Sequence, residues 1–110
     1  MFKRENRLIL GTKFNNFRSA STPQFNLKVK KNGMGINRFG IVVSKKVDKR
    51  AVVRNKIKRL FREALIELNR NMFTGNDILL IIKKEIISKT KKEELILLEN
   101  SLEKLAIIKR

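Results

Sequence analysis

The segment from Ala51 to Asn69 constrains the fold of this chain more than any other, because its hydrophobic residues recur at three- and four-residue steps. That period collects them on one side of an α-helix, where they can pack against a sheet or another helix. The apolar positions are Val53, Ile57, Leu60, Phe61, Ala64, Leu65 and Leu68. The sequence therefore predicts an amphipathic helix over this segment.

Two segments before this helix alternate between apolar and polar residues, as strands do when only one face is covered. They are Gln24–Lys30 and Arg38–Ser44, joined by a turn with two glycines over Lys31–Asn37. Their inward positions are Phe25, Leu27, Val29, Phe39, Ile41 and Val43. We expect the two strands to pair as a hairpin and to leave one basic face open.

Three further elements complete the expected order. A short helix is expected over Thr12–Ser19 and is ended by Pro23. The apolar run within Asp77–Lys83 indicates a strand inside the sheet, buried on both faces. A last helix is expected over Lys91–Ile108. Its apolar stripe is Leu95, Leu98, Leu102 and Leu105, with Glu93, Glu94, Glu99 and Glu103 largely outside it. The order is α-β-β-α-β-α, an α+β fold with a small mixed sheet packed by helices.

Composition bounds what such a domain can do. The chain has 110 residues, enough for one domain over residues 1–110, and Lys plus Arg number 27 against 10 Asp plus Glu, a net charge of +17. This charge repels itself unless a polyanion is near, so nucleic acid is the expected partner. Cysteine and histidine are absent, which excludes disulfides, thiolate nucleophiles and imidazole catalysis. No segment has the length of a membrane span or a secretion signal, so we expect a cytoplasmic protein.

On the polar side of the helix expected over Ala51–Asn69, the positive charge has a defined arrangement. At 100° per residue, one arc beside the apolar side holds Arg54, Asn55, Lys58, Arg59 and Arg62. The charge continues backward through Lys45, Lys46, Lys49 and Arg50. Arginine can fork onto phosphate oxygens or stack on a base, and lysine adds a mobile point charge. This arc could also be an ordinary solvated helix face, but few carboxylates neutralise it, which favours RNA binding.

The same residues carry a resemblance. Ser44-Lys45-Lys46-Val47, followed by Ala51-Val52-Val53-Arg54-Asn55-Lys56-Ile57-Lys58-Arg59-Leu60-Phe61-Arg62-Glu63-Ala64, resembles the signature of the bacterial ribonuclease P protein subunit, with its A-V-x-R-N-x-x-K-R-x-x-R-E core. The other elements fall in the order of that family. The resemblance implies a left-handed β-α-β crossover, as in the second domain of ribosomal protein S5, which is an exception to the usual rule.

The resemblance also implies a function. The protein would bind the catalytic RNA of ribonuclease P and the 5′ leader of precursor tRNA, and so assist endonucleolytic removal of the leader. No catalytic residue is expected in the protein, because the RNA subunit carries the catalysis. Mg²⁺ would be bound mainly by that RNA, with no metal site in the protein. We expect a monomeric protein in a 1:1 ribonucleoprotein, without a membrane partner.

Individual site residues follow from the same resemblance. The RNA-binding set is Arg54, Asn55, Lys58, Arg59, Arg62, Lys45, Lys46 and Arg50. The candidates for the leader cleft are Phe14, Phe17, Arg18 and Lys28. Relatives often have aromatic residues in place of the last two, so phosphate contacts are favoured over stacking there. Both phenylalanines can also be read as core residues, and for Phe17 core packing is favoured.

Composition alone leaves two other classes of function open. A ribosomal protein or a general RNA chaperone would be equally basic. A DNA-binding architectural protein is a further alternative, although an open sheet beside a basic helix suits single strands and irregular RNA better than a duplex groove.

Overall fold

The computed structural model describes residues 6–8, 17–88 and 90–109 of the chain. Most of the helix expected over Thr12–Ser19, including Phe14, lies outside the described residues. Its last residues are described and are not helical, since Arg18 and Ser19 begin strand β1 (Arg18–Ser21). The expected helix is therefore wrong at this end. Only Ala20 of β1 is buried, so the segment lacks the apolar alternation by which a strand is recognised.

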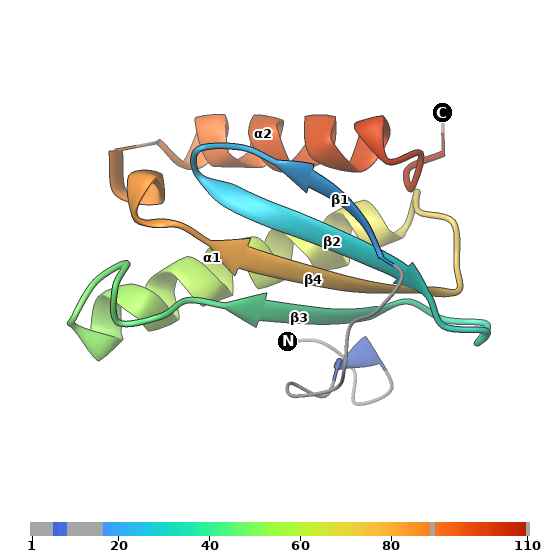
Figure 1. Cartoon of the computed structure of the whole chain (residues 1–110), viewed down its shortest axis with the longest axis horizontal. Coiled ribbons are helices and arrows are strands. Elements are labelled where there is room, and N and C mark those ends of the chain that lie inside the picture. The colour runs from blue at the N-terminus through green and yellow to red at the C-terminus, as the bar shows by residue number, and fades with distance from the viewer. Residues whose placement is uncertain (1–5, 9–16, 89, 110) are drawn as a thin grey trace.

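The described strands form one mixed sheet in the order β1-β2-β4-β3 (Figure 1). Three of them lie close to their predicted positions: β2 (Phe25–Lys31), β3 (Arg38–Val42) and β4 (Asn76–Ile82). β2 is antiparallel to β1 and to β4, whereas β3 is parallel to β4. The small mixed sheet is confirmed, and so is the interior position of β4.

The predicted hairpin between β2 and β3 is wrong, because β4 lies between them. Their connection passes the start of β4 and is held there. The N–H of Asn32 donates to the Gly75 carbonyl at 2.9 Å, and the N–H of Asn76 donates to Oδ1 of Asn37 at 3.0 Å. The most apolar strand takes the centre, where both of its edges are paired and its apolar side chains gain the most cover.

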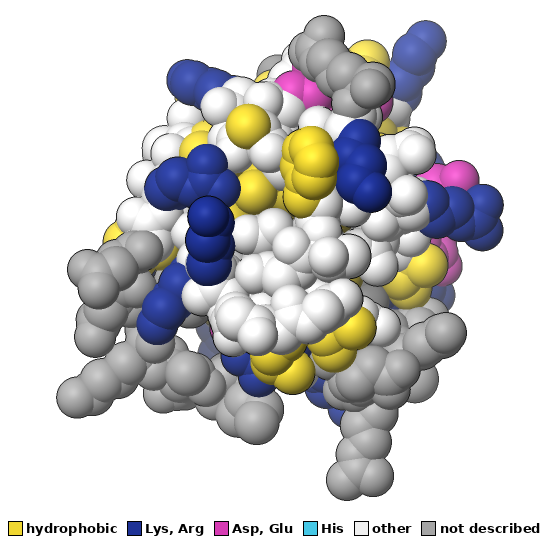
Figure 2. Space-filling model, turned by 90° about the vertical axis from the view of Figure 1, so that its right-hand side faces the viewer, with side chains coloured by type: hydrophobic (Ala, Val, Ile, Leu, Met, Phe, Trp, Pro, Cys, Tyr) yellow, Lys and Arg dark blue, Asp and Glu magenta, His cyan; other side chains and the backbone are white. Residues whose placement is uncertain are grey.

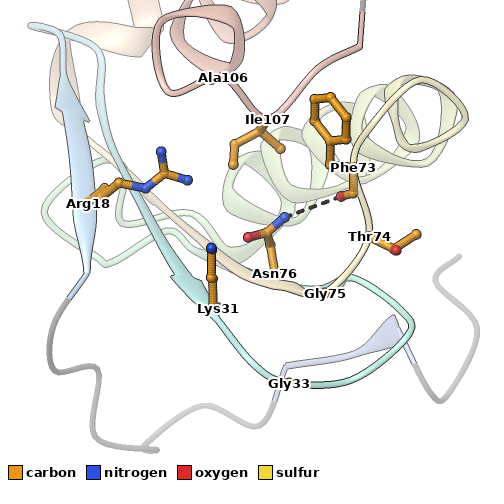
Figure 3. Close-up of a pocket in the computed structure, with 9 residues that line it drawn as sticks. All are labelled: Arg18, Lys31, Gly33, Phe73, Thr74, Gly75, Asn76, Ala106 and Ile107. Carbon is orange, nitrogen blue, oxygen red and sulfur yellow. Dashed lines mark hydrogen bonds between the residues drawn. The ribbon is translucent and has the colours of Figure 1, made fainter.

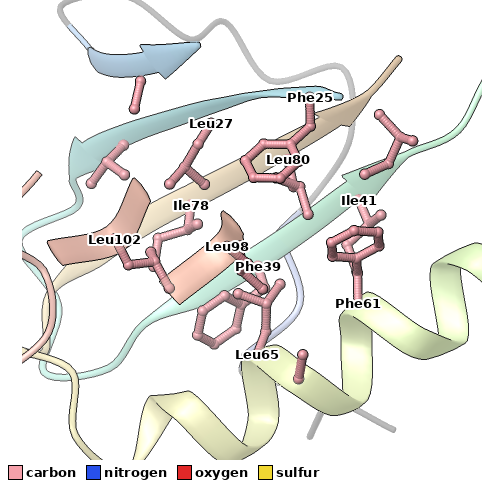
Figure 4. Packing of buried hydrophobic residues seen from close by; sticks show 14 of the residues in the cluster. Phe25, Leu27, Phe39, Ile41, Phe61, Leu65, Ile78, Leu80, Leu98 and Leu102 are labelled. Atoms are coloured by element: carbon pink, nitrogen blue, oxygen red, sulfur yellow. The ribbon is translucent and has the colours of Figure 1, made fainter. Parts of the chain in front are cut away.

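The described helices pack on one face of the sheet. α1 (Ala51–Asn69) has the predicted bounds, and α2 (Lys91–Lys104) follows a 3₁₀ helix, η2 (Lys84–Ser88), that the sequence pattern does not predict. Side chains from the sheet and both helices meet in one apolar cluster (Figure 4). Within it, the Phe25 and Phe61 rings meet edge to face with their centroids 6.1 Å apart. Neither of these helices is long and apolar enough to cross a membrane.

The opposite face of the sheet carries no helix from the described part of the chain (Figure 1). The register pairs Asn26 with Ile81 and Lys28 with Leu79, so these four side chains share that face. Leu79 and Ile81 are only half-buried. The expectation that β4 is buried on both faces is therefore wrong. We call this side of β2 and β4 the open face.

The unit β3-α1-β4 is a left-handed crossover. In Figure 1 both strands point to the left, β4 lies above β3, and α1 passes behind the sheet. A right-handed connection would place β4 below β3 in this view. The hand is the rare one for parallel strands, and it agrees with what the resemblance implies.

The last helix ends at Lys104, before the predicted end at Ile108. Ala106 has a φ of 56°, a left-handed conformation that an α-helix cannot continue through. The change of direction lets both Leu105 and Ile107 reach the core.

One glutamate of α2 departs from the predicted pattern. Glu94 is only 6% exposed, and its Oε2 has no hydrogen-bond partner among the described residues. Burial raises the pKa of this carboxyl to about 7. Glu94 stands four residues before Leu98, which is fully buried, and this spacing turns it toward the apolar side of the helix.

Candidate nucleic-acid interface

Cations gather on the flank of α1 that is turned away from α2. Arg54, Lys58 and Arg62 are spaced by four residues, so they form a row along the helix, and all three are half-buried. Asn55 lies beside this row and is exposed, whereas Arg59 is exposed farther round the helix and lines a groove with Glu63 and with Lys91 of α2. The helix therefore brings Arg54, Asn55, Lys58 and Arg62 together on one rigid surface, which we call the basic surface, and places Arg59 at its edge.

The acidic residues of α1 lie on its other flank. Glu63 and Glu67 line a groove of about 320 Å³ between α1 and α2, together with Lys91 and Glu99 of α2. These carboxylates lie on the opposite flank from the row of Arg54, Lys58 and Arg62, so they neutralise that row little. A polyanion is therefore attracted most strongly to the side of the helix that carries this row.

Arg54 ties the basic surface to the loop before α1. Its Nη1 donates to the carbonyl of Asp48 at 3.0 Å and to that of Lys49 at 2.8 Å. Lys45 and Lys46 of this loop are exposed. The loop and the helix therefore present their cations from one connected body.

Arg50 differs from the other candidates because it already has a carboxylate partner. Its Nε and Nη2 donate to the two carboxylate oxygens of Asp48 at 3.1 and 2.9 Å. Hydrogen bonds from the Arg50 side chain and backbone lower the pKa of Asp48 to about 2. The Arg50 side chain is exposed, so phosphate can still compete for it, but the net charge of the pair is close to zero.

The first turn of α1 has unfilled hydrogen-bonding capacity. Arg50 is its N-cap and gives no side-chain cap, and no acidic residue lies in the first turn. α2 is different, because Thr90 and Glu93 form a reciprocal capping box. The free backbone N–H groups at the start of α1 are thus available to an anion such as phosphate.

Phe17 and Lys28 meet on the open face. The Nζ of Lys28 lies 4.6 Å from the centroid of the Phe17 ring, within the range of a cation–π contact. Phe17 is 40% exposed, so the core reading of this residue is wrong. Two of the predicted leader-cleft residues are therefore neighbours on a surface rather than in the interior.

Arg18 lies on the other side of the sheet from this pair. The register places it beside Val29, which is buried, and its Nη1 donates to the carbonyl of Leu105 after α2 at 2.9 Å. Successive residues of a strand point to opposite faces, so Arg18 and Lys28 cannot line one cleft on the open face. The structure does not bring Arg18 together with the other leader-cleft candidates.

An ion pair at the end of the open face has no signal in the sequence pattern. Arg38 of β3 donates from Nε and Nη2 to Asp77 of β4 at 2.7 and 2.6 Å, and Asn32 Nδ2 donates to the same carboxylate at 2.9 Å. Burial raises the pKa of Asp77, but these hydrogen bonds outweigh that effect and hold the pKa below its ordinary value. The partners stand far apart in sequence, and only the parallel register joins them.

Comparison with known proteins decides what kind of protein carries these surfaces. A family model described as Ribonuclease P matches residues 2–106, nearly the whole chain. The chain belongs to the ribonuclease P protein family. The ribonuclease P protein component of Edwardsiella ictaluri is 38% identical over 89 residues, which are 77% of this chain and 74% of that protein.

Solved structures of the ribonuclease P family agree with the fold. The RNase P protein of Staphylococcus aureus superposes with a TM-score of 0.76 at 30% identity, covering 84% of each chain. The RNase P protein of Thermotoga maritima gives a TM-score of 0.72 at 30% identity, over 90% of this chain and 93% of that one. The α+β fold with a small mixed sheet is thus the fold of the family.

Family membership assigns a role. The chain is the protein subunit of an endoribonuclease holoenzyme, it takes part in tRNA processing, and its partner is the RNA of ribonuclease P. The ribosomal, chaperone and DNA-binding alternatives give way to this assignment.

Proposed function

We propose that the basic surface of α1, with Lys45 and Lys46 of the preceding loop, binds the catalytic RNA of ribonuclease P. The observation that carries the proposal is the row of Arg54, Lys58 and Arg62 on one flank of α1, with Glu63 and Glu67 on the other flank. The uncapped N–H groups of the first turn add neutral donors beside these cations. Phosphates of a folded RNA are the polyanion that suits a rigid row of arginine and lysine.

We further propose that the open face receives the 5′ leader of precursor tRNA. A leader is single-stranded, so its bases are available for stacking on an aromatic ring, and its phosphates for lysine. Phe17 and Lys28 offer both groups within 4.6 Å of each other. The half-buried Leu79 and Ile81 supply an apolar floor beside them.

The catalytic step would belong to the RNA. Mg²⁺ prefers oxygen ligands, usually carboxylates or phosphates. The described carboxylates include no group of three that could hold a metal ion, and Asp77 is already engaged by Arg38 and Asn32. These residues do not fit a protein-held magnesium site. We therefore propose that Mg²⁺ is bound by RNA phosphates, in a cytoplasmic holoenzyme with one protein per RNA.

Copurification from cells tests the proposed RNA partner. The tagged full-length chain should carry one structured RNA, and that RNA should cleave precursor tRNA in the presence of Mg²⁺ more efficiently with the protein than without it. A variant in which Arg54, Lys58 and Arg62 are replaced by Gln should lose the RNA. Recovery of intact ribosomal subunits instead, or retention of the RNA by the variant, would count against the proposal.

A further inference from the structure

A pocket of about 730 Å³ lies at the end of the molecule where β4 begins and the chain leaves α2. Its lining comes from segments far apart in sequence: Arg18 of β1, Lys31 of β2, Phe73 and Asn76 around the start of β4, and Ile107 after α2. Figure 3 shows Arg18 and Lys31 on one side of this space, with Phe73 across from them. The face in Figure 2 is the corresponding end of the molecule, where Lys and Arg side chains surround hydrophobic ones.

The walls of the pocket are set by the backbone. Gly75 has a φ of 90°, and a Cβ there would lie 3.0 Å from the Met34 carbonyl oxygen, so only glycine fits this turn. Asn76 Nδ2 donates to the carbonyl of Phe73 at 3.2 Å and fixes the connection before β4. The N–H of Phe73 also donates to the Ile107 carbonyl at 2.8 Å, so the backbone at Phe73 is held on both sides and places the 49% exposed ring at the pocket.

The chemistry of the lining is cationic and aromatic. Arg18 and Lys31 supply the charge, and the nine lining residues include no carboxylate. Lys109 lies close by, with its Nζ 5.7 Å from the centroid of the Phe73 ring. A ligand that joins an anionic group to a flat ring can contact both the cations and the Phe73 ring. A nucleotide is such a ligand, because its phosphate is anionic and its base can stack.

We propose that this pocket holds an unpaired nucleotide of RNA, with its phosphate between Arg18 and Lys31 and its base against Phe73. A paired base is stacked within its helix and cannot lay its face on a side chain, whereas an unpaired base can. The proposal rests on the proposed function only in taking RNA as the partner. The contact is separate from the open face, because Arg18 and Val29 point to the helix side of the sheet.

The position of the pocket also separates it from the start of the basic surface. α1 has 19 residues, and a helix of that length is roughly 27 Å long. Lys45, Lys46 and Arg50 precede the first residue of α1, whereas Phe73 follows the last turn of α1. One RNA strand held here is therefore a different segment from the one bound at the start of α1.

Paired substitutions test the pocket in the full-length protein. Phe73→Ala should weaken binding of an unstructured single-stranded RNA by about tenfold, the effect of losing one stacked base. Ile96→Ala is the matched control, because Ile96 on α2 is also 49% exposed but lies outside the pocket. Lys31→Gln should lower the slope of log K against log salt by about 0.7, and Lys92→Gln on α2 should lower it less. Equal effects of the pocket and control variants would overturn the proposal.

A measurement on the unsubstituted protein covers the case in which Phe73→Ala does not fold. A single-stranded RNA of about eight nucleotides, within the span of one small domain, should shift the amide NMR signals of Gly75, Asn76 and Ile107 together. Unmoved signals at these residues would overturn the proposal. Uridine monophosphate is the comparison, and if it shifts the signals at the same concentration as the RNA, the pocket binds free nucleotides and the RNA assignment is wrong.

Failure here is distinguishable from failure of the proposed function. If the triple Gln variant of Arg54, Lys58 and Arg62 loses the catalytic RNA while the pocket variants keep full affinity for single strands, the basic surface stands and the pocket assignment falls.

Discussion

The ammonium group of Lys28 lies 4.6 Å from the centre of the Phe17 ring, so the two side chains form a cation–π pair on the open face. Lysine is a flexible side chain with a strongly hydrated charge, and it can swing aside when a base approaches the ring. The pair therefore offers a stacking surface and a phosphate partner at one place.

Loss of the Phe17 ring should reduce discrimination between precursor and mature tRNA. Stacking of one base is worth about 1 to 3 kcal/mol, so we expect Phe17→Ala to weaken precursor binding by roughly 5- to 150-fold while mature tRNA binding changes little. Ile87→Ala is a suitable control, because Ile87 on η2 is 52% exposed and lies away from the open face. Binding titrations with both tRNAs measure the effect. Equal weakening of the two would show that Phe17 does not contact the leader.

Removing the cations of the basic surface should change the salt dependence of RNA binding. Arg54→Gln, Lys58→Gln and Arg62→Gln together should lower the slope of log K against log salt by about 2 to 3, since each phosphate contact contributes about 0.7 to 0.9. Glutamine is preferred to alanine because Arg54 donates to two loop carbonyls, and an amide can replace one of these donors. A matched triple variant, Lys56, Lys84 and Lys92 to Gln, should change the slope much less. The same slope for both triples would contradict the assignment.

The ion pair between β3 and β4 should stabilise the fold. Asp77→Asn leaves Arg38 without its charge partner, and Arg38 is 25% exposed, so we expect a loss of about 3 kcal/mol, the lower end for a buried pair. The pKa of Asp77 is lowered in the folded state, so this stabilisation is full above the unfolded pKa of about 4 and is lost as the pH falls further. Denaturant unfolding at pH 7 and pH 3 measures it. A difference between wild type and variant that does not shrink at pH 3 would refute the role of the charge.

Burial of Glu94 should have the opposite dependence on pH. The pKa of this carboxyl is raised to about 7, so the folded protein binds its proton more tightly than the unfolded chain, and stability falls as the pH rises from about 4 to 7. We expect Glu94→Gln to be more stable than wild type by roughly 2 kcal/mol at pH 8 and nearly equal to it at pH 4. Glu99→Gln, at an exposed position of the same helix, should show no such trend. A variant that is less stable at pH 8 would disprove this account.

Features that depend on neighbours in sequence could be predicted from the sequence. The bounds of α1 follow from its own periodicity, and the same periodicity sorts Arg54, Lys58 and Arg62 onto one flank. The burial of Glu94 also has such a signal, because Glu94, Leu98 and Leu102 are spaced by four residues. To predict the burial of Glu94 from this spacing, one must accept an acidic residue on the apolar side of a helix.

Features that depend on strand order could not be predicted. The alternation in β2 and β3 indicates two strands, but nothing within them shows that β4 lies between. The sides of Phe17, Arg18 and Lys28 depend on the register of β1, a short strand in which only one residue is buried. The left-handed crossover came from the family resemblance, since general rules favour the other hand.

The hydrogen bonds from Arg54 to the two loop carbonyls have a consequence for the thermodynamics of binding. A flexible loop must be ordered when it meets its ligand, at a cost of about 1 to 2 kcal/mol for each residue whose backbone is fixed. Arg54 holds Asp48 and Lys49 to the helix before any RNA arrives. The loop that carries Lys45 and Lys46 is therefore preorganised, and we expect its cations to add affinity for RNA with little loss of conformational entropy.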